Sequence, residues 1–179
     1  MKQTLGVTHK VALLGLFLAL GMILAFFEMY IPRPLPWAKL GLANVVTVVL
    51  IYLFGFRDAI MVSCARVVLV NFFTGGFGGP AFGLALAASV FSTVAMFLAI
   101  TMTEQKLGPI GISMIGAYVH IFIQLLLAAA LIIGQMQVFY LLPFFMLPTF
   151  FSGLLVGIFA LLLLQELEKR FVLKYRLPA

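Results

Sequence analysis

The stretch VALLGLFLALGMILAFF, Val11 to Phe27, is an apolar run without a single charge. A helix of about 20 apolar residues spans the hydrocarbon core of a bilayer. This run continues without charge apart from Glu28 as far as Ile31, which brings it to that length. The sequence therefore predicts that the chain enters a membrane with its first helix.

The composition of the whole chain agrees with this interpretation. Of its 179 residues, 65% are hydrophobic and only 9% are charged. Soluble domains carry about a quarter of charged residues. The apolar runs do not alternate with polar residues as membrane β-strands do. We therefore expect an all-α integral membrane protein, with residues 1–179 forming a single transmembrane domain.

Further apolar runs follow the first, separated by short polar or glycine-rich breaks. TGGFGGP (74–80) ends one run, because glycine and proline in series interrupt helices. GQMQ (134–137) divides a long uncharged segment that exceeds the length of one span. Pro143 and Pro148 should kink the last helix or mark an irregular start. Six transmembrane helices are predicted, at about 11–31, 40–56, 59–73, 81–101, 111–133 and 138–164.

The basic residues predict the orientation of these spans. Six spans place both termini on one side, and cytoplasmic loops of membrane proteins are enriched in lysine and arginine. With the termini inside, the outer side holds two basic residues, Arg33 and Lys39, and Arg66 lies within a span. The cytoplasmic side holds the other eight: Lys2, Lys10, Arg57, Lys106, Lys169, Arg170, Lys174 and Arg176. This asymmetry favours an N-in, C-in topology.

Polar side chains inside the predicted spans are the candidates for a binding site, because such groups are costly in a bilayer and tend to face a cavity. By their predicted depth, six of them lie between mid-membrane and the outer face: Glu28, Asn44, Arg66, Asn71, His120 and Gln124. We expect one polar cavity open to the outside. The external segment Pro32–Lys39, with Trp37 and Lys39, is expected to close it.

Each of these residues also has a structural interpretation. Asn44, Asn71 and Gln124 are of the type that forms hydrogen bonds between membrane helices. His120 is compatible with a neutral, hydrogen-bonded core histidine. Glu28 is a candidate counter-ion for Arg66 or Lys39, and tryptophan at the depth of Trp37 commonly anchors a protein at the interface. Arg66 has the strongest functional interpretation, since an arginine in the middle of a membrane span is a functional candidate by default.

The first predicted helix carries two stripes of small residues on opposite sides. Ala12, Gly15 and Ala19 fall on one face at 100° per residue, and Gly21, Ala25 and Glu28 fall on the other. Small residues allow close contact between membrane helices. The first stripe is therefore a candidate docking surface for a partner, and the second leads to the expected cavity. Internal packing of both stripes is the alternative.

The segment KLGLANVVTVVLIYLFGFRDA (39–59), followed by a span that runs into GGFGGP, resembles the family called heptaprenyl diphosphate synthase component I, also labelled Gx transporter. That family is similar to the substrate-binding (S) subunits of energy-coupling factor transporters. The resemblance covers nearly the whole chain, and its most specific part is 36–44 with Arg66 and the glycine loop.

The resemblance implies a multi-pass protein of a prokaryotic plasma membrane that binds a vitamin-like substrate near the outer face. The loop after the first helix would act as a lid. A small-residue stripe, here Gly15-x-x-x-Ala19 with Ala12 one turn before, would dock a transmembrane coupling subunit. Two partner ATPases would hydrolyse ATP. The cationic groups would suit an anionic substrate, such as a quinone-related or isoprenoid-related molecule.

The family name raises the alternative of a prenyl-diphosphate synthase. Such enzymes hold Mg²⁺–diphosphate with aspartate-rich motifs, because hard cations prefer oxygen ligands. This chain contains one aspartate, Asp58, and no Walker A motif or metal-spaced His/Cys cluster. We therefore expect no catalysis, cofactor or metal in this chain, which leaves a non-catalytic membrane component of a synthase as the alternative function. A structural subunit of a membrane redox complex would need a cofactor site, and none is apparent.

Overall fold

The computed structural model describes residues 7–30, 41–103 and 106–171, and side chains as far as residue 169. Within these ranges it contains six α-helices, as the sequence predicts. They are α1 (Val7–Met29), α2 (Asn44–Leu53), α3 (Phe56–Phe73), α4 (Pro80–Met102), α5 (Pro109–Leu127) and α6 (Leu142–Phe171). A π-helix, η1 (Ala128–Ile133), extends α5, and a 3-10 helix, η2 (Met136–Leu141), precedes α6.

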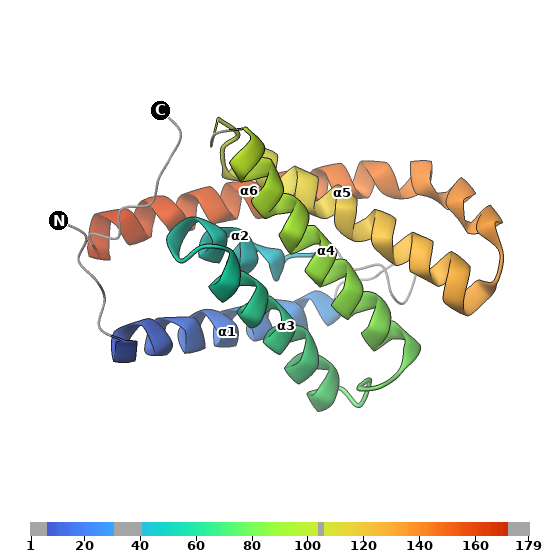
Figure 1. The fold of residues 1–179 in the computed structure, drawn as a ribbon, viewed down its shortest axis with the longest axis horizontal. Coiled ribbons are helices and arrows are strands. Elements are labelled where there is room, and N and C mark those ends of the chain that lie inside the picture. The colour runs from blue at the N-terminus through green and yellow to red at the C-terminus, as the bar shows by residue number, and fades with distance from the viewer. Residues whose placement is uncertain (1–6, 31–40, 104–105, 172–179) are drawn as a thin grey trace.

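The helices form a bundle around α2, which contacts all five of the others. Every residue of α2 from Asn44 to Ile51 is buried. A helix that is buried all round occupies the interior of a bundle, whereas a helix on the outside has one exposed face. The start of α1 and the end of α6 lie at the same end of the bundle, on the left of Figure 1.

Two glycines limit the central helix. Gly41, with φ 82°, precedes α2, and Gly55, with φ 89°, separates it from α3. Side chains larger than hydrogen are strained at these angles, so glycine fits both turns. The helix is therefore shorter than the predicted span 40–56. Ten residues rise about 15 Å, roughly half of the hydrocarbon thickness of a bilayer.

The antiparallel contact between α5 and α6 depends on glycines that the sequence analysis did not single out. Gly153 and Gly157 form a GxxxG pair, which lets membrane helices approach closely. A Cβ at Gly157 would lie 2.5 Å from the Cα of Ile110, and one at Gly153 would lie 3.1 Å from the Cα of Met114. The α5 backbone therefore fills the space that side chains would need at these positions.

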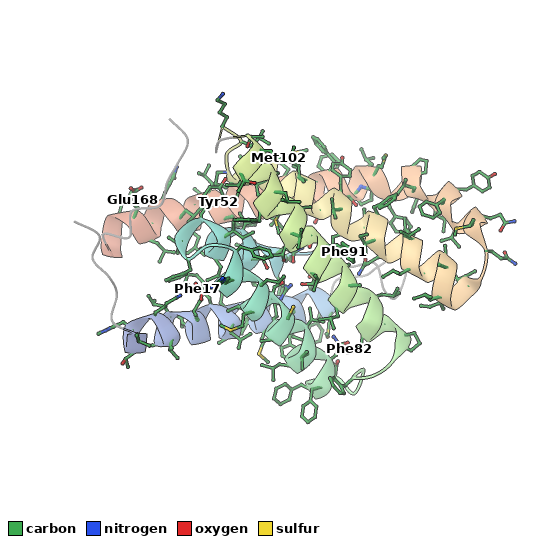
Figure 2. The ribbon with its side chains drawn as sticks, in the orientation of Figure 1. Phe17, Tyr52, Phe82, Phe91, Met102 and Glu168 are labelled. Carbon is green, nitrogen blue, oxygen red and sulfur yellow. The ribbon has the colours of Figure 1, made fainter. Side chains whose placement is uncertain are left out.

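The surface of the described bundle is apolar. Large hydrophobic side chains such as Leu16, Phe91 and Met102 are exposed, and Figure 2 shows Phe91 and Met102 on α4. Phe17 instead lies in the buried core, on the inner side of α1. Four segments, α1, α4, Pro109–Ile133 and Met136–Lys169, are long and apolar enough to cross a membrane. Together these features indicate a membrane protein.

The orientation in the membrane can be tested with single cysteines in a protein whose only native cysteine, Cys64, is replaced by serine. The eight-to-two charge distribution predicts that a cysteine at Gln135 reacts with an impermeant thiol reagent from outside the cell. A cysteine at Lys106 should react only after the membrane is opened. The reverse labelling pattern would show that the termini are external.

Candidate functional site

A small cavity of about 40 Å³, lined by both polar and apolar residues, lies between α1, α2, α3 and α5, with Ala85 of α4 also at its wall. Five of the predicted site residues line it: Glu28, Asn44, Arg66, Asn71 and His120. Room of this size suits a few water molecules or a compact polar group. It is much smaller than the pockets of about 300–1,000 Å³ that enclose whole drug-sized ligands.

Arg66 is the cation of this cavity. Its side chain is only 7% exposed, and its Nη2 donates a hydrogen bond to Oδ1 of Asn44 over 3.2 Å. Its Nε has no hydrogen-bond partner among the described residues. A buried donor without a partner carries a large desolvation cost, and more so when the group is charged. Arg66 can therefore accommodate a further acceptor at the cavity.

A glycine on α1 makes room for the Arg66 side chain. Gly21 is buried, and a Cβ at this position would lie 3.0 Å from Cδ of Arg66 and 3.6 Å from Cγ2 of Val46. The inward face of α1 thus fixes how the guanidinium enters the cavity. The predicted stripe of Gly21, Ala25 and Glu28 lies on this side, and Ala25 and Glu28 line the cavity themselves.

Glu28, at the end of α1, is 3% exposed. Its Oε1 accepts a hydrogen bond from the backbone N–H of Gly41 over 2.6 Å, just before α2 begins. It lines the same cavity as Arg66, yet the two form no direct ion pair in the described part of the chain. The Glu28 carboxylate is therefore held by the backbone just before α2. Glu28 and Arg66 thus place one acidic and one basic side chain at the wall of the same cavity.

The remaining predicted residues differ in position. The Nδ2 of Asn71 donates to the carbonyl of Val67 over 2.8 Å, one turn back on α3, so this side chain is partly occupied by its own helix. Gln124 is 1% exposed and does not line the cavity, and its Oε1 has no hydrogen-bond partner in the described ranges. Trp37 and Lys39 lie outside the described residues.

A chain of hydrogen-bonded, buried hydroxyl groups was not predicted by the sequence analysis. The Oγ1 of Thr47 donates to Oγ of Ser63 over 3.4 Å, and Ser63 shares a 2.6 Å hydrogen bond with Ser89. These contacts join α2, α3 and α4. Ser63 precedes Arg66 by three residues and so lies on the same side of α3. That spacing is the signal in the sequence that could have identified it.

Comparison with family models assigns the chain. The model described as heptaprenyl diphosphate synthase component I matches residues 17–163, which is most of the sequence and includes every residue of the cavity. The chain belongs to this family. Comparison with curated proteins and with solved structures gave no match.

For a heptaprenyl diphosphate synthase component I, the arrangement of acidic groups is informative. The one aspartate of the sequence, Asp58 in the first turn of α3, forms an ion pair of 2.7 Å with Lys10 of α1. Its side chain is therefore committed to joining two helices, away from the residues of the cavity. The chemistry available at the cavity is that of one guanidinium, one carboxylate, two amides and an imidazole.

Proposed function

We propose that this protein is the substrate-binding membrane subunit of an uptake transporter of the energy-coupling factor type, and that its substrate is a small anionic molecule. The observation that carries the proposal is Arg66. It is buried, it lines a cavity together with four other polar residues, and its Nε lacks a partner within the described residues. A guanidinium in such a place is suited to pair with an acceptor that arrives from outside the chain.

The outer face of α1 supports the part of the proposal that concerns partners. Ala12, Gly15 and Ala19 are all exposed, while Leu14, Phe17, Gly21 and Glu28 of the same helix are buried. A smooth exposed stripe on a membrane helix suits close contact with another helix. In this proposal the stripe contacts a transmembrane coupling subunit. Two ATPase subunits hydrolyse ATP, and this chain is not an enzyme.

The family description favours a second candidate, a non-catalytic membrane component of a heptaprenyl diphosphate synthase. The two functions require different partners. Affinity purification of the tagged chain from membranes of its own cells, followed by mass spectrometry, should recover a coupling subunit and ATPases if it is a transporter subunit. Recovery of a soluble, aspartate-rich synthase instead would contradict the transporter proposal and support the second candidate.

The proposed docking stripe can be tested by Gly15→Leu. A Cβ at Gly15 meets no atom within 4 Å, so the larger side chain should leave the fold intact. It adds bulk where two backbones must approach closely, so recovery of partners should be lost while the protein stays folded. Gly83→Leu, at another exposed glycine with open space around it, is the matched control on α4. Unchanged recovery with Gly15→Leu would show that the stripe does not dock a partner.

A further inference from the structure

The position of Glu28 suggests more than a structural hydrogen bond. Its carboxylate accepts from the N–H of Gly41 at the amino end of α2. The amino end of a helix carries a partial positive charge and attracts anions. Glu28 therefore occupies a place where the backbone favours negative charge, beside the one buried arginine of the described chain.

The amino end of α2 is formed by the turn that leads into the helix. The N–H groups of Asn44 and Val45 already donate to the carbonyls of Gly41 and Leu42, so the N–H groups that remain at this end come from Gly41 to Ala43. The N-cap residue of α2 is Ala43, whose side chain makes no capping hydrogen bond, and alanine is among the poorest N-cap residues. Ala43 and Asn44 both line the cavity. Membrane transport proteins commonly use the amino end of a short, interrupted helix to bind the anionic group of a substrate. With only ten residues, α2 is also short.

Arg66 supplies an independent observation that points to a ligand. Its side chain is more than nine-tenths buried, it lines the same cavity as the end of α2, and its Nε is without a hydrogen-bond partner among described residues. The cavity volume of about 40 Å³ limits what can enter this position. A carboxylate or phosphate group matches this size more closely than a whole ring system does.

We propose that the cavity binds the compact anionic group of the substrate, a carboxylate or phosphate, between Arg66 and the amino end of α2. Glu28 competes with this anion for the same position. This inference rests on the function proposed above. The charges of Arg66 and Glu28 balance before an anion arrives. An entering anion makes the buried site negative, and like charges in a poorly solvated site repel strongly. Glu28 must therefore give up its contact with Gly41 when the anion binds.

The test is Glu28→Gln in the full chain, reconstituted in nanodiscs of zwitterionic lipid and titrated calorimetrically with inorganic phosphate and with acetate. Glutamine keeps an oxygen that can accept from the Gly41 N–H but removes the competing charge. The affinity for the anion should rise by about tenfold, the scale on which a neighbouring charge shifts an ionic equilibrium. Glu168→Gln is the matched control, because it makes the same change of net charge at an exposed position near the end of α6 (Figure 2).

Two sources of the anion are distinguished by a second arm that adds phosphatidic acid to the nanodiscs. Loss of free phosphate binding in that arm identifies a lipid headgroup as the occupant, and retained binding identifies a soluble anion. Both results support the shared chemistry. Weaker or unchanged affinity in Glu28→Gln, or no anion binding by either protein, would overturn the proposal. If Glu28→Gln does not fold, Glu28→Ala replaces it with the same expectations. Because partner recovery is measured separately, either proposal can fail while the other holds.

Discussion

Replacing Arg66 by methionine should lower the affinity for the anionic ligand by about 30-fold or more. Methionine preserves most of the volume of the side chain but removes the charge and every donor. Losing one partner of a buried, hydrogen-bonded charge pair costs about 2–5 kcal/mol. The measurement is calorimetric titration of the purified protein, with inorganic phosphate and with any ligand that mass spectrometry finds after purification.

The control for this prediction is Arg57→Met, on the same helix. Arg57 is exposed in the first turn of α3, so its loss changes the net charge of α3 without reaching the cavity. Its affinity should stay close to that of the wild type. Near-wild-type affinity in a folded Arg66→Met protein would show instead that Arg66 is a structural group, held by Asn44 and by the charge of Glu28.

Gly157→Leu should destabilise the protein strongly. A Cβ at this position would already lie 2.5 Å from the Cα of Ile110 and 3.2 Å from Cβ of Ser113. The first of these atoms belongs to the backbone, so the two helices must separate. Overpacking typically costs about 1–3 kcal/mol, and we expect a loss near the upper end of this range. Unfolding in detergent, followed by circular dichroism against a chemical denaturant, measures the change.

The matched variant is Gly83→Leu on α4, where a Cβ meets nothing within 4 Å. Leucine is a better helix former than glycine by up to about 1 kcal/mol, so this change should be neutral or stabilising. Equal stability of Gly157→Leu and Gly83→Leu would show that the α5–α6 contact tolerates bulk. It would also remove the reason for glycine at Gly157.

The six helices could be predicted because apolar length is a strong signal in a chain with so little charge. The ends of α2 could not be placed in the same way. Apolar residues continue on both sides of it, and the boundaries depend on the positive φ angles of Gly41 and Gly55. The π-helix at 128–133 was also unpredictable, since AAALII fits an α-helix equally well. The α5–α6 seam, by contrast, has a readable signal in the GxxxG spacing.

The candidate site was predictable in part, because polar residues at similar depth in a bundle tend to share one interior space. Depth placed Arg66, Asn44 and His120 together, and the cavity includes all three. Depth alone does not give the direction of a side chain around its helix, so Gln124 was assigned to a cavity that it does not line. The contact between Glu28 and Gly41 depends on a backbone N–H, which no side-chain pattern reveals.

The two faces of α1 have a thermodynamic consequence. Its inner face touches the candidate cavity through Ala25 and Glu28, and its outer face presents the proposed partner stripe. It is also the least buried of the four segments long enough to span a membrane. If an anion that displaces Glu28 shifts α1 and changes the affinity for the partner, linkage requires the partner to change the affinity for the anion by the same factor. In that case, the anion affinity measured on the isolated chain differs from the anion affinity of the chain bound to its partner.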